Sequence, residues 1–235
     1  MYQYAAIVPA YNEEGAIAQV VTDLNNFAKS NQINLQVIVV NDCSKDNTGN
    51  IIDQLPCVAL HLPVNLGIGG AVQTGFKYAY RNGFDFAFQV DGDGQHPPEE
   101  MIHLLNGQQQ HQSNVTIGSR FITGEGFQSS FMRKVGIRYF QFLLQALTGF
   151  KITDSTSGFR MLDRKALELV CNYYPDEYPE PEAIVLYARN QFKVTEVPVK
   201  MKDRESGNSS IGFFASLYYM AKVSLAILFS YIRIK

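Results

Sequence analysis

Short apolar runs alternate with helix-length amphipathic segments along the first hundred residues. The apolar runs have the length and composition of buried strands, and they cover residues 4–9, 35–40, 58–62 and 84–90. Helices are expected to follow them, ending near Lys29, over 48–55, over 70–81 and from Glu99 onward. Strands that alternate with helices predict an α/β fold, with a mostly parallel central sheet flanked by helices on both faces.

Polar residues follow each apolar run where the strand is expected to end; they are Tyr11, Asp42, Asn65 and Asp91. The carboxyl ends of parallel strands meet at one edge of a sheet, and ligands bind at that edge in open α/β folds. We therefore expect these four residues to gather at that edge. Asn12 is expected to cap the first helix, with two acidic residues in its first turn.

The stretch 88–99, FQVDGDGQHPPE, carries the clearest chemistry. Asp91 and Asp93 lie one residue apart, and the glycines at 92 and 94 allow backbone angles that turn both carboxylates toward one point. Mg²⁺ is usually held by one or two carboxylates together with substrate phosphates. An Asp-Gly turn is also typical of a hairpin, but Gln-His-Pro-Pro and a helix follow here, not a second strand.

The glycines at 67, 69 and 70 precede a predicted helix and look like part of a dinucleotide loop. The third glycine of that motif and the acidic residue about 20 positions further on are missing, so the dinucleotide interpretation is weak. Two alternatives stay open. The glycines allow close packing of the helix N-terminus, or they allow the backbone to approach a nucleotide.

Two segments of the C-terminal half are candidates for surface helices. Residues 129–150 hold more aromatic and leucine residues than one core-facing stripe needs, with three basic residues near the start. This pattern fits either an amphipathic core helix or a helix in a membrane interface. Residues 211–232 are apolar but contain Lys222, whose charge is costly in hydrocarbon. We expect a helix there on a membrane surface or between two copies of the chain, in preference to a membrane span.

Composition and charge narrow the class of protein. The chain has 235 residues, 46% hydrophobic and 18% charged, which fits one large folded domain and excludes a disordered chain. The formal net charge of −2 argues against a general nucleic-acid binder. Three cysteines without metal-ligand spacing fit a reduced cytosolic compartment. We expect no signal peptide, because the N-terminus enters a strand directly.

Six segments occur in an ordered series: VPAYNEE (8–14), VVNDCSKDNT (39–48), NLGIGGAVQTGFKYA (65–79), DGDGQHPPE (91–99), GSRF (118–121) and TDSTSGFR (153–160). Over about residues 4–205 the chain resembles family 2 glycosyltransferases with the GT-A fold. The branch that it resembles is the dolichol-phosphate mannose synthase-like or polyprenyl-phosphate glycosyltransferase group. Asn41 stands where many members have aspartate, which leaves the choice of nucleotide open.

The resemblance implies a UDP- or GDP-linked sugar as donor and a Mg²⁺ or Mn²⁺ ion held by Asp91, Asp93 and Gln95. The residues that it implies for nucleotide-sugar binding are Pro9, Tyr11, Glu13, Asp42, Asn65, Gly69, Asp91, Arg120 and Arg204. Helix N-terminal charge is an equal alternative for Glu13, and a structural or solvated role is the alternative for the two arginines. The implied catalytic domain covers 1–210, with a nucleotide-sugar half over 1–120 and an acceptor half over 121–210, followed by the helix at 211–235.

The resemblance also implies an acceptor, which is a polyprenyl or dolichyl phosphate, with a sugar hydroxyl in polysaccharide or glycolipid assembly as the alternative. The expected reaction is direct displacement at the anomeric carbon with inversion. The catalytic candidates are Asp93 through the metal, Asp154 as base or acceptor-positioning residue, and Glu182 as second candidate base. Arg160 is expected to be structural and to pair with an acid. The protein is then cytoplasmic, at the cytoplasmic face of a membrane.

A nucleotidyltransferase is the alternative from another class of enzyme, because it also uses paired acids and a metal on an α/β sheet. Such an enzyme would favour a basic, glycine-rich phosphate loop after the first strand. The corresponding segment here, residues 8–14, is acidic instead. The sequence therefore favours glycosyl transfer.

Overall fold

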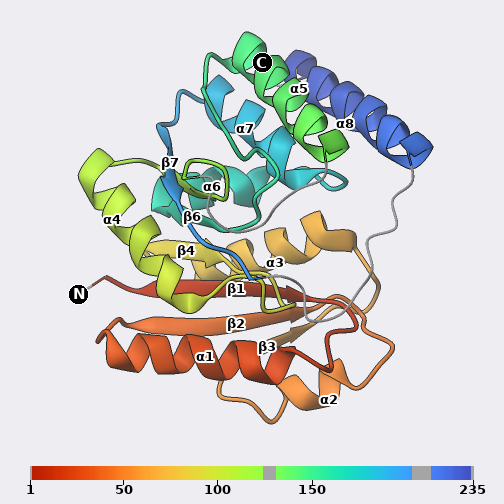
Figure 1. The fold of residues 1–235 in the computed structure, drawn as a ribbon. Helices are drawn as coiled ribbons and strands as arrows, with labels where there is room; N and C mark the ends of the chain where they lie inside the picture. Colours follow the sequence, from red (N-terminus) through yellow and green to blue (C-terminus); the bar gives the residue numbers. More distant parts are fainter. Residues whose placement is uncertain (1, 124–130, 203–212, 234–235) are drawn as a thin grey trace.

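The computed structural model describes residues 2–123, 131–202 and 213–233, and Figure 1 shows their arrangement. In these residues seven strands form one sheet in the order β3-β2-β1-β4-β6-β5-β7. The strands are β1 Tyr4–Ala10, β2 Leu35–Asn41, β3 Val58–His61, β4 Phe86–Gln89, β5 Val115–Ser119, β6 Arg160–Asp163 and β7 Val194–Pro198. The helices are α1 Ile17–Ser30, α2 Thr48–Ile52, α3 Gly67–Arg81, the short 3-10 helix Pro98–Glu100, α4 Met101–His111, α5 Phe131–Thr148, α6 Arg164–Asn172, α7 Pro179–Arg189 and α8 Phe213–Arg233.

The sheet is mostly parallel, as the sequence predicts. Strand β1 pairs in parallel with β2 and β4, β2 pairs in parallel with β3, and β5 pairs in parallel with β7. Strand β6 alone among the described strands runs antiparallel to its neighbours, β4 and β5. The alternating strands and helices thus produce the predicted α/β fold, with helices on both faces of the sheet (Figure 1).

Each face of the sheet has its own hydrophobic core. Along β1 the buried side chains alternate: Ala5 and Ile7 join the core that includes α3 and α6, and Ala6 and Val8 join the core that includes α1 and α4. Alternation of this kind is expected of a central parallel strand covered on both sides. Helices α5 and α8 form an outer layer over α7 (Figure 1). Among the described residues, no helix combines the length and hydrophobicity needed to cross a bilayer.

The prediction for the start of the first helix is wrong. Helix α1 begins at Ile17, and no side chain caps it. Asn12 instead adopts a left-handed backbone conformation, with φ of 58°, and its Oδ1 accepts the Lys45 backbone N–H at 2.8 Å. The Glu13 N–H donates to Thr48 Oγ1 at 2.8 Å. Because the loop after β1 binds the loop after β2, its N–H groups have partners without forming a helix.

Three elements between residues 110 and 175 were not predicted: β5, β6 and α6. Other elements differ from prediction mainly at their ends. Strand β4 is shorter than the apolar run 84–90, and α3 starts at Gly67, earlier than residue 70. The polar loop 201–210 lies largely outside the described residues.

Candidate active site

The loops after β1, β2 and β4 meet at the carboxyl edge of the sheet. The Asp42 backbone N–H donates to the Ala10 carbonyl at 2.9 Å, and Asn65 Nδ2 donates to the Asp42 carbonyl at 3.0 Å. A Cβ built on Gly92 would lie 2.8 Å from the Pro9 carbonyl oxygen, so a side chain at 92 would clash with the loop after β1. Glycine at this position therefore lets the turn that carries Asp91 approach the first strand closely.

The turn after β4 presents two carboxylates and is ordered by its own hydrogen bonds. Gly94 has a φ of 77°, in the left-handed region that favours glycine. The Gln95 N–H donates to Asp93 Oδ1 at 3.1 Å. Asp91 keeps 32% of its side chain exposed, so its carboxylate can meet a ligand from solvent. Asp91, Asp93 and Gln95 supply only oxygen donors, which hard divalent ions such as Mg²⁺ prefer.

The donor set of this turn fits a shared metal site better than a closed protein cage. Within the described part of the chain, no group of three or more His, Cys, Asp or Glu side chains has the arrangement of a metal centre. Two carboxylates and an amide are too few ligands to fill an octahedral shell. A metal at this turn would therefore complete its coordination with water and with phosphate oxygens of a ligand.

His96 is buried behind the aspartate turn. Its Nδ1 accepts the Asp91 backbone N–H at 3.0 Å, and its Nε2 lies 3.5 Å from Asp91 Oδ2. The imidazole packs against the Phe159 ring, with 4.8 Å between ring centroids. Burial lowers the pKa of His96 to about 4, against the opposing effect of nearby acids. His96 is therefore neutral at pH 7.

Arg120 and Asp154 form a buried ion pair beside the turn. Arg120 Nε donates to Asp154 Oδ2 at 2.7 Å, and its Nη2 donates to Asp154 Oδ1 at 2.8 Å. The Asp154 side chain is fully buried, and the Arg120 side chain is 15% exposed. Although burial alone lowers the pKa of Arg120, its bonds to Asp154 raise the pKa above its usual value, and the charge of Asp91 adds to that increase. The guanidinium thus acts electrostatically on both aspartates.

Glu196 on β7 fixes the backbone that carries Asp154. Its Oε1 accepts the Asp154 N–H at 2.8 Å, and its Oε2 accepts the Thr153 N–H at 2.6 Å. Burial raises the pKa of Glu196, and these hydrogen bonds oppose the increase. The sequence analysis missed this residue. The signal was an acidic residue within the strand pattern FKVTEVPVK, where an inward-facing charge needs a partner.

The Asp42 carboxylate already has protein partners. Its Oδ1 accepts the Leu66 N–H at 2.7 Å, and its Oδ2 accepts the Gly67 N–H at 2.9 Å. These N–H groups belong to the start of α3, where a negative charge is favourable. Asp42 therefore caps α3 from another loop. A contact between Asp42 and a nucleobase stays a prediction.

Gly69 packs against protein. A Cβ built on Gly69 would lie 2.3 Å from the Pro175 carbonyl oxygen and 2.5 Å from that of Asp176. Glycine is needed there because the first turn of α3 packs directly against the backbone of residues 175–176, which precede α7. Of the two alternatives for the glycine run, this geometry favours close helix packing.

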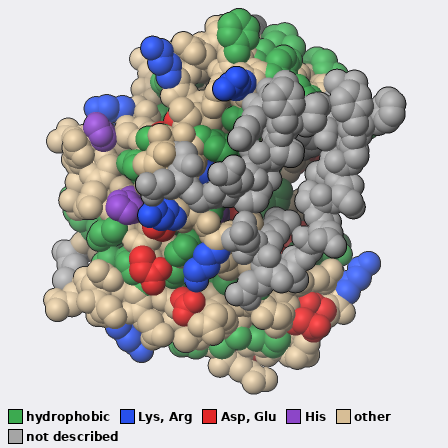
Figure 2. Space-filling model, in the orientation of Figure 1, with side chains coloured by type: hydrophobic (Ala, Val, Ile, Leu, Met, Phe, Trp, Pro, Cys, Tyr) green, Lys and Arg blue, Asp and Glu red, His purple; other side chains and the backbone are tan. Residues whose placement is uncertain are grey.

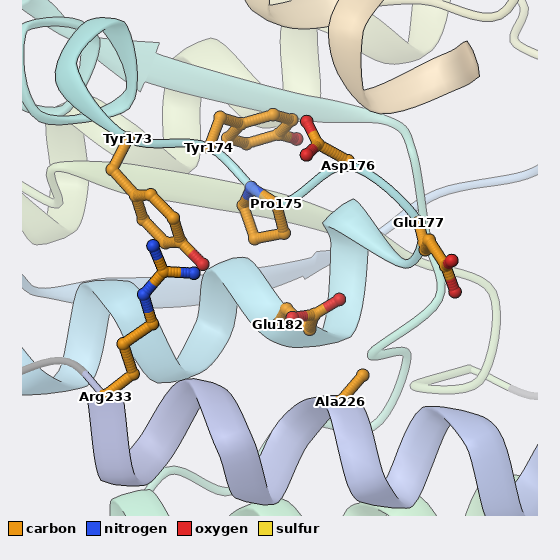
Figure 3. A pocket seen from close by; sticks show the side chains of 8 residues that line it. All are labelled: Tyr173, Tyr174, Pro175, Asp176, Glu177, Glu182, Ala226 and Arg233. Carbon is orange, nitrogen blue, oxygen red and sulfur yellow. The ribbon is translucent and has the colours of Figure 1, made fainter. Parts of the chain in front are cut away.

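Glu180 and Glu182 project from different sides of α7, because residues two apart on a helix are separated by about 200°. Glu182 accepts the Ser230 hydroxyl of α8 at 2.6 Å. It lines a pocket of about 250 Å³ with Ala226 and Arg233 of α8 (Figure 3). Glu180 faces the aspartate turn: Gln89 Nε2 lies 3.5 Å from its Oε1.

Glu180 is thus an acidic residue of the site that the sequence analysis did not single out. Burial raises its pKa, the positive charge of Arg160 lowers it, and the negative charge of Asp91 raises it further. Arg160 is fully buried and structural, as predicted. Arg160 Nη2 and Nε donate to the carbonyl oxygens of Ser155 and Ser157 at 3.1 and 2.7 Å, and within the described part of the chain no ion pair joins it to an acid.

The remaining predicted residues lie on the same edge or outside the description. Pro9 is buried at the end of β1, and the Tyr11 side chain is 41% exposed in the loop that follows. Glu13 is partly buried in that loop, ahead of α1. Arg204 falls outside the described residues.

Comparisons with known proteins agree with this geometry. A model described as "Glycosyl transferase family 2" matches residues 5–170. The chain is 32% identical over 214 residues to the UDP-N-acetylglucosamine–dolichyl-phosphate N-acetylglucosaminyltransferase of Methanococcus voltae, covering 83% of each chain. It is 30% identical over 219 residues to the polyprenol monophosphomannose synthase of Mycolicibacterium smegmatis, covering 87% of this chain and 79% of that protein.

The fold has a counterpart among solved structures. The crystal structure of glucosyl-3-phosphoglycerate synthase from Mycobacterium tuberculosis, in complex with Mn²⁺, UDP and glucosyl-3-phosphoglycerate, matches with a TM-score of 0.75 and 15% identity. The match covers 100% of this chain and 81% of that chain. At this identity the likeness concerns the fold alone, which is the predicted GT-A fold. The match to the family model and the two relatives show that the chain is a glycosyltransferase that belongs to glycosyl transferase family 2.

Proposed function

We propose that this glycosyltransferase moves a sugar, with inversion, from a nucleotide sugar to a polyprenyl or dolichyl phosphate. One relative described above is named for N-acetylglucosamine transfer to dolichyl phosphate, and the other is named for the synthesis of polyprenol monophosphomannose. The donor half is residues 1–120 and the acceptor half is residues 121–210. UDP- and GDP-linked sugars are both candidates for the donor.

The observation that carries the choice of acceptor is the burial of Asp154 in its pair with Arg120. A hydroxyl acceptor needs a carboxylate that can take its proton in the transition state. Asp154 is enclosed and already bound to a cation, Glu182 accepts a hydrogen bond from α8, and Glu180 accepts one from Gln89. A phosphate acceptor is already largely ionised, since such groups have a second pKa near roughly 6. It therefore needs no base.

The chain's own residues would act mainly by binding and by electrostatics. Asp91 and Asp93, with Gln95, would hold a Mg²⁺ or Mn²⁺ ion, which neutralises charge on a departing diphosphate. Arg120, whose charge acts on Asp91, adds positive potential at the same place. Pro9, Tyr11 and Asn65 lie on the edge where the nucleoside would bind. Asp154 would orient Arg120, and its own carboxylate would take no proton.

An apolar face over α5 and α8 supports work at a membrane surface. The two helices lie side by side, and Tyr139 of α5 hydrogen-bonds Ser224 of α8 at 3.0 Å. Large apolar side chains are exposed on this layer, and they include Phe142, Tyr218, Leu225, Leu228, Phe229 and Ile232. Figure 2 shows hydrophobic side chains along the upper edge of the molecule, where Figure 1 places α5 and α8.

Exposed cations accompany the same layer, namely Arg138 on α5 and Lys222 and Arg233 on α8. An apolar helix face with basic residues is typical of helices that lie in the interface of an anionic membrane. These features support the proposal that the enzyme works at the cytoplasmic face of a membrane, where a lipid phosphate is available. A contact between two copies of the chain is the alternative for this face.

The test is an assay of purified protein with UDP- and GDP-sugars, Mn²⁺ or Mg²⁺, and either polyprenyl phosphate in micelles or glycans with free hydroxyls. We expect product only with the lipid phosphate. Glu180→Gln and Glu182→Gln provide the control for a base, because a general base contributes about 10²–10⁴-fold to rate. Both variants should keep turnover within a few-fold. A loss of that size in either variant, together with transfer to a hydroxyl, would overturn the proposed acceptor.

A further inference from the structure

The imidazole of His96 contacts one residue of the aspartate turn at two points. The Asp91 backbone N–H donates to Nδ1 at 3.0 Å, and Asp91 Oδ2 lies 3.5 Å from Nε2. We propose that His96 is a positioning residue that holds the Asp91 carboxylate in its metal-binding orientation. This inference rests on the proposed function, since it assumes a divalent ion at Asp91.

The backbone hydrogen bond fixes the proton on the ring. Because Nδ1 accepts from the Asp91 N–H, it carries no proton, and a neutral imidazole then has its proton on Nε2. Asp91 Oδ2 lies 3.5 Å from that nitrogen, so the N–H is electrostatically favourable for the carboxylate. One imidazole therefore accepts from the backbone of Asp91 and attracts its carboxylate. The two contacts together restrict the rotation of the Asp91 side chain.

The ring itself is held rigidly. Its side chain is 2% exposed, and it packs on Phe159 at 4.8 Å between centroids, with 32° between the ring planes. The 91–96 turn is also tied to the segment after β7, because the Lys202 N–H donates to the Gln95 carbonyl at 2.9 Å. Because the ring is buried and the backbone of the turn is hydrogen-bonded, the contacts between His96 and Asp91 are already formed before a ligand binds.

Glycine at 158 leaves room for the carboxylate at its other oxygen. A Cβ built on Gly158 would lie 3.0 Å from Asp91 Oδ1 and 3.1 Å from Gln89 Nε2. The Asp91 carboxylate thus has Oδ2 near the imidazole and Oδ1 next to the space that a side chain at 158 would fill. Such outer contacts orient metal-binding side chains, and their loss typically lowers metal affinity by about 10–100-fold.

The test measures Mn²⁺ binding to the full chain by electron paramagnetic resonance, with no nucleotide present. His96→Phe keeps an aromatic ring against Phe159 but removes both nitrogen contacts. We expect its Mn²⁺ dissociation constant to rise about 10–100-fold. His96→Asn, whose Oδ1 can still accept the Asp91 N–H, should fall between the wild type and His96→Phe. His103→Phe is the matched control, because His103 is 51% exposed on α4, and it should bind Mn²⁺ like the wild type.

A merely structural role would lower the melting temperature without changing Mn²⁺ affinity, so thermal unfolding is recorded for every variant. Excess Mn²⁺ should restore turnover in His96→Phe if the ring acts through the metal. A folded His96→Phe that binds Mn²⁺ within twofold of wild type overturns the inference. If His96→Phe does not fold, wild-type affinity in His96→Asn overturns it. Asp91→Asn distinguishes failure of the His96 inference from failure of the proposed function. Undiminished Mn²⁺ binding in that variant refutes the metal site of the proposed function itself.

Discussion

The Arg120–Asp154 pair should be one of the most costly contacts in the protein to break. Arg120 makes three hydrogen bonds to the Asp154 carboxylate, from its backbone N at 3.2 Å, Nε at 2.7 Å and Nη2 at 2.8 Å. Removing one partner of a buried ion pair costs about 3–5 kcal/mol, because the other charge stays buried without its counter-ion. Arg120→Met leaves the fully buried Asp154 in that state.

The size of the effect makes the prediction measurable. A cost of about 3–5 kcal/mol is a large share of a typical total stability of about 5–15 kcal/mol. In a chain of this size, about 2–4 °C of melting temperature is lost per kcal/mol. Arg120→Met should therefore melt roughly 6–20 °C below the wild type. Asp154→Asn should cost less, since the asparagine still accepts a hydrogen bond and Asp91 partly balances the Arg120 charge.

Denaturant unfolding of both single variants and the double variant gives the coupling energy between the two residues. The double variant should be less destabilised than the sum of the singles, because it leaves no unpaired charge. Asp53→Asn is the control: it breaks the His61–Asp53 contact, whose side chains are 41% and 59% exposed, and should cost at most about 1 kcal/mol. If Arg120→Met costs under about 1 kcal/mol and the two changes are additive, Asp154 is not committed to Arg120. Its role as a base then returns.

Three further predictions follow from burial, packing and exposure. Burial raises the folded-state pKa of Glu182 above its unfolded value, so its stabilising contribution is complete below the unfolded pKa and is lost as pH rises through the folded pKa. Glu182→Gln should therefore be more stable than the wild type at pH 8 in denaturant titrations, and equal stability at pH 8 would contradict this. Gly69→Ala should cost roughly 1–3 kcal/mol or more, because its Cβ would meet the Pro175 carbonyl, whereas Gly15→Ala, with no atom within 4 Å, should not destabilise the fold by a similar amount. The double variant Leu225→Ser and Phe229→Ser should bind anionic vesicles at least tenfold more weakly in a sedimentation assay, because both apolar side chains are exposed. Its melting temperature should stay near that of the wild type. Unchanged vesicle binding would instead favour a contact between two copies of the chain.

The sequence predicts the first hundred residues well because the signals there are local. Apolar runs followed by polar loops indicate parallel strands and the edge that binds ligands, and the described β1, β2 and β4 end just before Tyr11, Asp42 and Asp91. The predicted start of α1 was wrong because the backbone of residues 12–14 has partners that are distant in sequence. The N–H groups of residues 12–14 bind side chains of the neighbouring loop, and periodicity within one segment cannot reveal such partners.

The part of the chain after residue 110 depends on pairings across long stretches of sequence, so less of it was predictable. Glu196 lies 42 residues from Asp154, and nothing near either residue indicates their hydrogen bond. The choice between Glu180 and Glu182 depends on how α7 is rotated against β4 and α8. Both acids stand at the same helix N-terminus in sequence. Only the packed structure shows which one faces Asp91.

The reversal of β6 has a consequence for how such enzymes can diversify. Because this strand runs backward, the chain enters it at the edge where β4 and β5 leave the sheet, so residues 154–158 stand opposite the aspartate turn. Insertions or deletions in the stretch that leads into β6 would reshape the wall across from the turn. The loops after β1 and β2 need not change with it. If the proposed function holds, this part of the edge could evolve toward new recipients of the sugar while the loops after β1 and β2 keep the nucleotide.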